Sequence, residues 1–250
     1  MRKEPFGVGD FVHVYNRGNK KQVIVKDEHD RRHFLQMLFY FNTEITPPNP
    51  FHNLKTKLRS NLNENNLNEF GWPDHWVSRK PIVKILVFIL MRNHFHLILE
   101  EVTENGIAKF MQRIGTGMTM YHNTKYQDTG RLFQGSYKAK IVDKDLYLKY
   151  LSVYIQVKNC FELYEGGFEA AIKDFDKAYT LAVEFPYGSL AQYYGKIAMP
   201  IVDKSLFLEI FPAPNNYKSF AKECLVDLEN RLGELTFEGL ENTLIEVKPQ

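Results

Sequence analysis

The sequence predicts an α+β protein in which strands and helices follow one another in the first part and helices dominate the rest. Two observations carry this prediction. Up to about residue 160, short β-branched and aromatic runs stand between segments whose apolar residues recur at helical spacing. Beyond that point helical spacing prevails, and Pro and Gly residues separate the pieces.

Composition indicates one large domain, or a domain with an appendage. A chain of 250 residues with 44% hydrophobic residues can form a sizeable core. Its two cysteines provide neither a disulfide framework nor a cysteine zinc site, which favours a reducing compartment. The start of the chain has no apolar signal core, and the longest apolar run, Ile82 to Met91, is far below the roughly 20 residues of a membrane span. We therefore expect a cytoplasmic protein without membrane contact.

Charge is distributed unevenly along the chain. Residues 1–160 carry 24 Lys and Arg against 15 Asp and Glu, a net charge of +9, whereas residues 161–250 carry 8 against 15, a net charge of −7. A basic first part indicates a polyanionic partner, although a solvated charged surface explains the same count equally well.

The first elements are a strand, a turn and a helix. The run of valines and aromatics at 10–16 predicts a strand, 17–19 a turn, and the acidic start and apolar spacing of 28–41 a helix. Residues 42–80 lose this periodicity and are interpreted as an insertion with one short helix at about 53–62. The two tryptophans of this insertion are expected to pack locally rather than to stack on bases.

The central elements continue the pattern. An apolar strand at 82–91 is followed by a strand at 94–100, a helix at 107–121, and a turn leading into a strand within 130–142. In the predicted helix at 107–121, Gly115 and Gly117 weaken the helix and allow a neighbour to approach closely. The remaining predicted helices span about 146–157, 166–183, 189–198, 203–211 and 217–232.

Two histidines with one apolar residue between them end the apolar region. Side chains in a strand alternate between faces, so His94 and His96 share a face and Phe95 points to the other. Two neutral imidazoles on one face can chelate a divalent cation. Taken alone, a His-x-His pair is more often a pair of hydrogen-bonding side chains in a sheet.

A later helix carries tyrosines at a spacing that forms one column. Tyr150, Tyr154 and Lys158 lie four residues apart, beside a separate apolar stripe. A His-x-His strand, a tyrosine helix and a basic surface together favour cleavage of a phosphodiester by a tyrosine nucleophile, with a cation on the imidazoles polarising the phosphate. The rejoining of the strand then needs no ATP, because the covalent intermediate conserves the bond energy.

Four segments resemble the single-tyrosine transposases of the HUH endonuclease superfamily, in the order that this family shows. They are His13-Val-Tyr-Asn-Arg-Gly18, Met91-Arg-Asn-His-Phe-His-Leu-Ile-Leu99, Gly130-Arg-Leu-Phe-Gln-Gly-Ser-Tyr-Lys138 and Tyr147-Leu-Lys-Tyr-Leu-Ser-Val-Tyr-Ile-Gln-Val-Lys-Asn159. The long segment after the tyrosine is more similar to the REP-associated tyrosine transposases than to the short insertion-sequence enzymes.

The resemblance implies a ferredoxin-like antiparallel sheet flanked by helices, with an additional, mostly helical C-terminal segment. Residues 1–160, with the insertion at about 42–80, would form the catalytic domain, and residues 161–250 an acidic helical extension. The implied activity is cleavage and rejoining of single-stranded or hairpin DNA with Mg²⁺ or Mn²⁺, through a 5′-phosphotyrosine and a free 3′-hydroxyl. A homodimer is one assembly that the resemblance leaves open.

The resemblance also implies roles for single residues. His94 and His96 take the metal-ligand positions, and Tyr154 takes the position of the nucleophile. Six basic residues are expected to contact DNA, namely Arg17, Arg92, Arg113, Arg131, Lys138 and Lys140.

One position departs from the family pattern. A Gln or Asn one turn after the tyrosine usually supplies a third metal ligand, but here that position is Lys158, which when protonated cannot ligate a metal. Lys158 is left with two roles, contact with the phosphate or activation of Tyr154. Asn159 can be the third ligand only if the helix departs from α geometry, because five residues on an ideal α-helix lie well off the face of Tyr154.

Two alternatives stay open. Lys158 is also compatible with a DNA-binding protein that kept the fold and lost or weakened cleavage. A more distant alternative is a nucleotide phosphoesterase that uses paired histidines, which the chain disfavours because Ile98 stands where a third alternating histidine would be.

Overall fold

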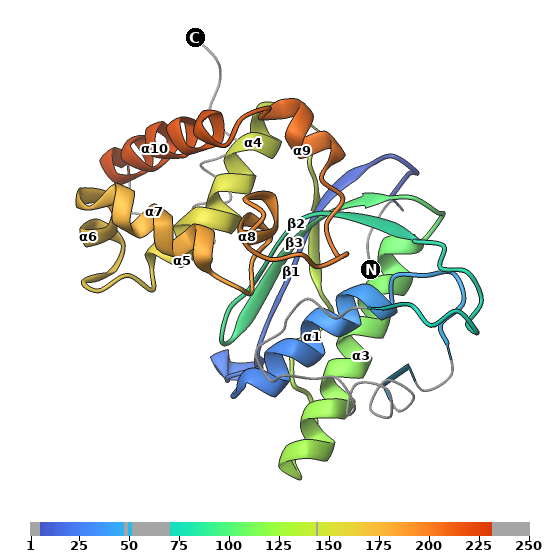
Figure 1. Cartoon of the computed structure of the whole chain (residues 1–250). Helices are drawn as coiled ribbons and strands as arrows, with labels where there is room; N and C mark the ends of the chain where they lie inside the picture. The colour runs from blue at the N-terminus through green and yellow to red at the C-terminus, as the bar shows by residue number, and fades with distance from the viewer. Residues whose placement is uncertain (1–5, 48–49, 52–70, 144, 232–250) are drawn as a thin grey trace.

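A four-stranded antiparallel sheet forms the centre of the molecule (Figure 1). The computed structural model describes residues 6–47, 50–51, 71–143 and 145–231. The elements of the first part are β1 (Phe11–Arg17), the 3-10 turn η1 (Asn19–Lys21), α1 (Glu28–Tyr40), β2 (Val83–Leu90), β3 (His94–Glu101), α3 (Gly106–Tyr126) and β4 (Lys138–Ile141).

The strand order is β2-β3-β1-β4, and each neighbouring pair is antiparallel. This order places β3 between β1 and β2, so that each helix crosses over one intervening strand, as in a ferredoxin-like fold. The α+β, ferredoxin-like fold class is thereby confirmed. The predicted strands at 10–16, 82–91 and 94–100 and the predicted helices at 28–41 and 107–121 all form, with shifted ends.

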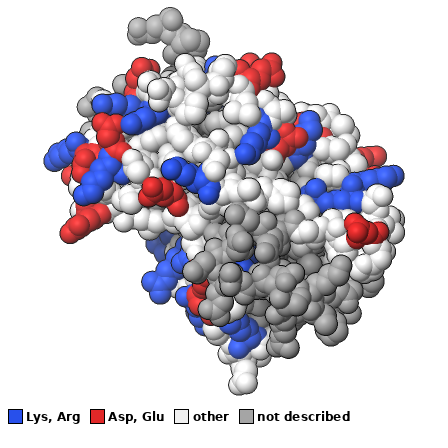
Figure 2. All heavy atoms as spheres, viewed as in Figure 1, with Lys and Arg blue, Asp and Glu red and all other residues white. Residues whose placement is uncertain are grey.

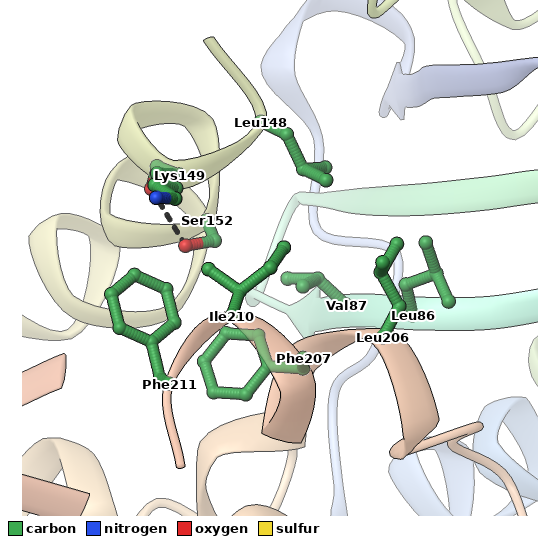
Figure 3. A pocket seen from close by; sticks show the side chains of 9 residues that line it. All are labelled: Leu86, Val87, Leu148, Lys149, Ser152, Leu206, Phe207, Ile210 and Phe211. Atoms are coloured by element: carbon green, nitrogen blue, oxygen red, sulfur yellow. Dashed lines mark hydrogen bonds between the residues drawn. The ribbon is translucent and has the colours of Figure 1, made fainter. Parts of the chain in front are cut away.

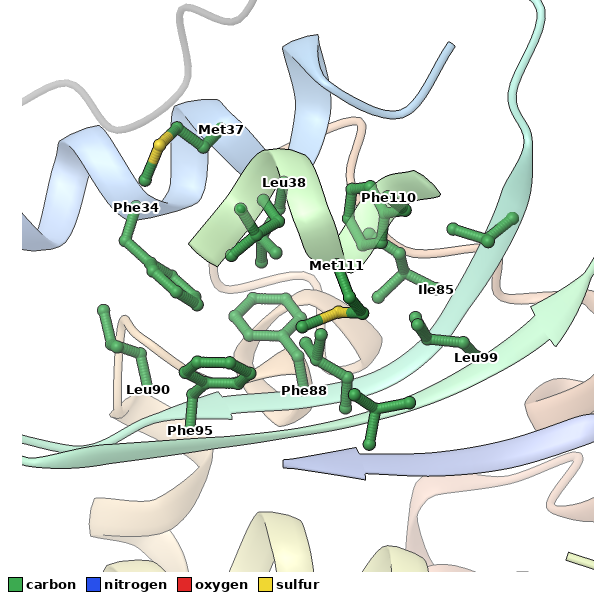
Figure 4. Close-up of a cluster of buried hydrophobic side chains, with 14 of the residues drawn as sticks. Phe34, Met37, Leu38, Ile85, Phe88, Leu90, Phe95, Leu99, Phe110 and Met111 are labelled. Atoms are coloured by element: carbon green, nitrogen blue, oxygen red, sulfur yellow. The ribbon is translucent and has the colours of Figure 1, made fainter. Parts of the chain in front are cut away.

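Helices α1 and α3 cover one face of the sheet. Alternate residues of the strands point toward them and form an apolar core, of which Figure 4 shows Phe34, Phe88, Phe95, Leu99 and Phe110. The helices pack closely, because a side-chain carbon built on Gly117 would lie 2.7 Å from the Phe41 ring. The expected close approach at this glycine is therefore present.

Helices from the rest of the chain pack on the side of the other face (Figure 1). They are α4 (Asp145–Val153), the π-helical turn η2 (Tyr154–Lys158), α5 (Asn159–Phe161), α6 (Gly167–Lys173), α7 (Phe175–Glu184), α8 (Ser189–Tyr193), α9 (Ser205–Ile210) and α10 (Pro214–Arg231). The single helix predicted at 166–183 is two helices, because the backbone of Asp174 leaves the helical region between them.

The C-terminal helices share a second apolar cluster with α4 and with the sheet. Helix α9 packs against α4 and β2 around an apolar cavity of about 10 Å³ (Figure 3). A cavity of this size is about one water-sized probe, so the packing at this junction is nearly complete. The division of the chain at residue 160 remains a prediction, and helix α5 runs across that position.

The part of the insertion that the structure describes packs against α1. Trp72 stacks on Tyr40 with ring centroids 6.1 Å apart, and Trp76 meets Trp72 edge to face. The two tryptophans therefore pack locally, as the sequence predicts. The short helix predicted at 53–62 lies outside the described residues.

No helix within the described ranges is long and apolar enough to cross a membrane.

Candidate active site

The histidine pair lies on the face of the sheet that α4 and its neighbours cover. Strand β3 directs Phe95 into the core beneath α1 and α3, so His94 and His96 point the other way, together with Ile98. The register of β1 and β3 places Tyr15 opposite His96 and Arg17 opposite His94. The shared face that alternation predicted for the two histidines is therefore present.

A groove of about 460 Å³ opens beside the two imidazoles. It runs between β1 and the segment that leads into β4, and polar and basic residues dominate its walls. The lining residues are Tyr15, Asn16, Arg17, Lys21, His94, His96, Gln134, Gly135, Ser136 and Lys138. Three of these residues, Arg17, Lys21 and Lys138, present cations to the groove, and such cations attract a phosphate backbone.

The tyrosine helix changes its geometry at the tyrosine. Helix α4 ends at Val153, and residues Tyr154–Lys158 form a π-helical turn before α5 begins at Asn159. In a π-helix a residue bonds to the fifth residue along, so one turn holds an extra residue. The side-chain amide of Asn159 accordingly donates to the carbonyl oxygen of Tyr154 at 2.9 Å and to that of Ile155 at 3.3 Å.

The π-turn brings Asn159 to the histidine pair. Oδ1 of Asn159 lies 3.3 Å from Nε2 of His94. The ring of Tyr154 meets that of His96 edge to face, with centroids 5.8 Å apart. The condition set for Asn159, that the helix departs from α geometry, is met, because the turn is π-helical.

Hydrogen bonds fix the orientation of the groups around His94. Nδ2 of Asn93 donates to the carbonyl oxygen of Lys21, so Oδ1 of Asn93 faces Nδ1 of His94 at 2.7 Å and accepts its proton. The amide nitrogen of Asn159 is bound to helix carbonyls, which turns its oxygen toward Nε2 of His94. In neutral His94, Nε2 therefore carries a lone pair. This lone pair faces the lone pairs of Asn159 Oδ1, with no proton between the two atoms.

This donor set fits a cation. Two facing lone pairs repel unless a proton or a metal ion lies between them, and burial lowers the pKa of His94, which disfavours the protonated form. Two imidazoles and an amide oxygen are ligands that Mn²⁺ and other divalent ions accept. No cluster of three or more His, Cys, Asp and Glu side chains suited to a metal occurs among the described residues, so a site with three protein ligands here would include the amide.

A third histidine completes the group, and sequence reasoning did not assign it to the site. His13 on β1 is fully buried, and its Nε2 lies 2.9 Å from Nδ1 of His96. Burial, aided by the charge of Lys140, lowers the pKa of His13 to about 3. Burial and the neighbouring His13 likewise hold the pKa of His96 well below its usual value. All three imidazoles are therefore neutral at physiological pH.

Lys158 lies beside Tyr154 and reaches the next helical turn. It is nearly buried and pairs with Glu162, and its Nζ lies 5.4 Å from the centre of the Tyr154 ring. Because the π-turn places Asn159 next to His94, Lys158 lies beside the tyrosine instead.

A buried hydrogen-bond network holds the π-turn against the sheet. Ser189 on α8 donates to Oε1 of Gln156 at 2.6 Å, and Nε2 of Gln156 donates to the hydroxyl of Tyr217 on α10 at 3.0 Å. Ser189 also accepts the backbone N–H of Phe88 on β2 at 3.0 Å. The C-terminal helices therefore fix the position of the tyrosine helix relative to the strand next to β3.

The structure brings some of the predicted DNA-contacting residues to the groove and places others elsewhere. Arg17 and Lys138 line the groove, and Lys140 lies on the same edge strand. Arg92 is exposed in the turn that precedes His94. Arg131 lines a neighbouring groove that shares three wall residues with the first one, Asn16, Gly135 and Ser136.

Arg113 is the exception. It lies on α3, across the sheet from the histidines, and its Nη1 donates to the backbone carbonyl oxygens of Phe41 and Thr43 at 2.8 and 2.5 Å. These bonds satisfy carbonyls at the end of α1. Lys21, which the sequence did not single out, lines the groove in its place.

These observations define the class of protein. It has a ferredoxin-like sheet, and two histidines, an amide and a tyrosine lie together on one face of this sheet, beside a basic groove. Residues 74–158 match the family of IS200-like transposases. No curated protein matches the chain. A solved structure described as a REP-associated tyrosine transposase bound to a REP hairpin matches with 10% identity and a TM-score of 0.43, over 80% of this chain and 88% of that one. The family resemblance inferred from the motifs is confirmed by the family match.

Proposed function

We propose that this protein cleaves and rejoins single-stranded or hairpin DNA through a covalent 5′-phosphotyrosine. The observation that carries the proposal is the convergence of Asn159 with His94, His96 and Tyr154. The two histidines and the tyrosine lie within residues 74–158, which match IS200-like transposases. Strand β3 supplies the histidines, the π-turn begins with Tyr154, and Asn159 follows directly after it, so one continuous helical segment presents both the proposed nucleophile and a proposed metal ligand.

Tyr154 is the proposed nucleophile. Its hydroxyl oxygen attacks the scissile phosphorus and gives up its proton to water, while the bond from phosphorus to the 3′-oxygen breaks and the 3′-oxygen takes up a proton from water to leave as a hydroxyl. A second 3′-hydroxyl then attacks the phosphotyrosine and releases Tyr154. Since Tyr154 and His96 are in ring contact within one chain, we propose that Tyr154 works with the histidines of its own chain.

His94, His96 and Asn159 are the proposed ligands of Mg²⁺ or Mn²⁺. A cation held there would polarise the scissile phosphate as a Lewis acid. Two imidazole ligands favour Mn²⁺ over Mg²⁺, because magnesium prefers oxygen donors. Asn93 keeps His94 in the tautomer whose Nε2 faces the site.

Lys158 is proposed to stabilise negative charge at Tyr154 and the phosphate. Its ammonium group lies beside the tyrosine ring and is held by Glu162, so it is present before DNA binds. A fixed cation next to a developing negative charge lowers the barrier without reorganisation during the reaction.

The DNA strand is proposed to follow the groove beside β1 and the segment leading into β4. Arg17, Lys21 and Lys138 line this groove and offer cations to the phosphates. In the view of Figure 2, the acidic and basic side chains are intermixed over the C-terminal helices rather than gathered by sign. We do not assign those helices to the DNA, and we assign to them the positioning of the tyrosine helix.

The position of Asn159 favours an enzyme over a DNA-binding protein that has lost cleavage. That alternative rests on Lys158 replacing a ligand, whereas the π-turn places the side chain of Asn159 next to His94. Cys160 and Cys224 are both free, in accord with the proposed reducing, cytoplasmic setting.

The assembly state is tested by light scattering of the purified protein, in which a mass of twice 29.3 kDa would identify a homodimer.

The deciding experiment is capture of the covalent intermediate. Single-stranded hairpin oligonucleotides from the sequence flanking the gene are incubated with the protein and Mn²⁺, and adducts are separated by denaturing electrophoresis. We expect an adduct with the native protein and with Tyr150→Phe, and none with Tyr154→Phe. An adduct in Tyr154→Phe would refute the nucleophile assignment, and hairpin binding without any adduct would favour the non-catalytic alternative.

A further inference from the structure

His13 forms a hydrogen bond that reaches from the neighbouring strand to a proposed metal ligand. Its Nε2 lies 2.9 Å from Nδ1 of His96, and the two rings are nearly parallel, with an interplanar angle of 15° and centroids 5.2 Å apart. His13 is completely buried and Tyr15 stacks on the same ring at 5.0 Å. The side chain of His13 has no access to solvent, so its contribution must pass through its neighbours.

The pairing of two neutral imidazoles allows only one proton between them. Burial favours the neutral form of both rings. A neutral imidazole carries its proton on one nitrogen and a lone pair on the other, so one ring of the pair donates and the other accepts. Either His13 donates from Nε2 to His96, or His96 donates from Nδ1 to His13.

The two arrangements differ in what they leave at the other nitrogen of His96. If His13 donates, the proton of His96 sits on Nε2, and neither nitrogen of His96 can bind a metal. If His96 donates, its Nε2 keeps the lone pair. The second arrangement matches the one at His94. There Asn93 accepts the Nδ1 proton, and Nε2 keeps its lone pair and faces Asn159.

We propose that His13 is a positioning residue that accepts the Nδ1 proton of His96 and so holds His96 in the tautomer that can bind a divalent cation through Nε2. The inference rests on the proposed metal site and adds to it a residue that does not touch the metal or the DNA. It also assigns the remaining proton of His13 to Nδ1, a buried atom that has no hydrogen-bond partner among the described residues.

The tautomer is measured directly in the metal-free protein. Long-range ¹H–¹⁵N spectra of ¹⁵N-histidine-labelled protein distinguish a protonated ring nitrogen from one with a lone pair. We expect His96 with its proton on Nδ1 in the native protein. A proton on Nε2 of His96 would overturn the proposal, and this readout needs neither metal nor DNA.

Variants then link the tautomer to metal binding. His13→Phe keeps an aromatic ring but removes the acceptor, and we expect Mn²⁺ to bind about 10- to 100-fold more weakly by titration calorimetry. His13→Gln can place an acceptor at the same position and is expected to recover most of the affinity. The matched control is His122→Phe, because His122 is also a buried histidine but lies on α3, across the sheet. Native affinity in a folded His13→Phe protein would overturn the proposal.

The outcomes separate this inference from the proposed function. If the native protein binds no Mn²⁺ and forms no adduct, the proposed function fails, and the ¹⁵N spectra alone decide which ring donates. If the native protein binds Mn²⁺ and forms the adduct but His13→Phe and His13→Gln both bind Mn²⁺ as tightly, only the role of His13 fails. Should His13→Phe not fold, the native spectrum and the glutamine variant still decide.

Discussion

Oδ1 of Asn159 lies 3.3 Å from Nε2 of His94, although Asn159 follows Tyr154 by five residues. The π-helical turn Tyr154–Lys158 produces this contact, because it adds one residue to the turn between the tyrosine and the amide. A helix that departs from α geometry at this point serves the site, since regular α geometry would direct Lys158 to the position that Asn159 occupies.

Replacing Asn159 tests this relationship. We expect Asn159→Ala to weaken Mn²⁺ binding at least about tenfold, because one of three protein ligands is lost. Deletion of Lys158 is the complementary variant: it shortens the π-turn to an α-turn and puts the asparagine four residues after Tyr154. We expect that deletion to retain Mn²⁺ binding, measured by calorimetry alongside circular dichroism. Unchanged binding in Asn159→Ala would exclude the amide as a ligand.

Lys158 and Glu162 give a prediction about rate rather than affinity. We expect Lys158→Met to slow adduct formation on the order of 100-fold, because the fixed cation beside Tyr154 is removed. Glu162→Gln keeps the lysine and loses only its partner, so its effect is expected to be several times smaller. Single-turnover adduct kinetics with saturating Mn²⁺ measure both. Equal rates in native protein and Lys158→Met would remove Lys158 from the mechanism.

The network around Gln156 predicts coupling between stability and activity. Gln156→Leu leaves the buried hydroxyls of Ser189 and Tyr217 without their amide partner, which costs about 1–3 kcal/mol in the free energy of unfolding. Because the same bonds hold the π-turn, adduct formation should also slow at temperatures where the variant is fully folded. Urea unfolding and adduct kinetics at 20 °C measure the two effects. A stability loss without any loss of rate would show that the network does not position Tyr154.

The buried histidines predict a loss of stability on mild acidification. The pKa values of His13, His94 and His96 are lowered in the folded protein, so below pH 6.5 the unfolded chain takes up protons that the folded chain does not. Each such histidine lowers the free energy of unfolding by about 1.4 kcal/mol per pH unit below 6.5, until its own folded pKa is reached. Urea unfolding at pH 7.0, 6.0 and 5.0 measures the fall, and His13→Gln should make it shallower. Constant stability from pH 7.0 to 5.0 would contradict the lowered pKa values.

Salt dependence separates the residues of the groove from Arg113. Arg17→Ala and Lys138→Ala are each expected to reduce the slope of log Kd against log salt by about 0.7 for single-stranded DNA, the value for one lost phosphate contact. Arg113→Ala should leave the slope unchanged and lower stability by about 1–3 kcal/mol, because carbonyls at the end of α1 lose their donor. Fluorescence anisotropy between 50 and 300 mM NaCl gives the slopes. A reduced slope in Arg113→Ala would place DNA on the α3 face.

Features that depend on local periodicity could be predicted from the sequence. The alternation of a strand puts His94 and His96 on one face whatever the rest of the fold does, and the helical spacing at 28–41 and 107–121 identifies α1 and α3. The resemblance of four ordered motifs added the topology of the sheet. Helix ends were less well predicted, as at Asp174, where a change of backbone conformation divides one periodic segment in two.

The sequence by itself determined which residues could do chemistry here: a histidine pair, a tyrosine and a basic surface, each set by spacing within a few neighbouring residues. Only the tertiary structure decided how they combine. The bond between His13 and His96 joins residues 83 positions apart and depends on the register of β1 against β3. Asn159 rather than Lys158 lies next to His94 because of the π-turn. Gln156, Ser189 and Tyr217 hold this turn through hydrogen bonds that form only when the C-terminal helices pack. Local spacing cannot encode such contacts, because their free energy comes from groups that are distant in the chain.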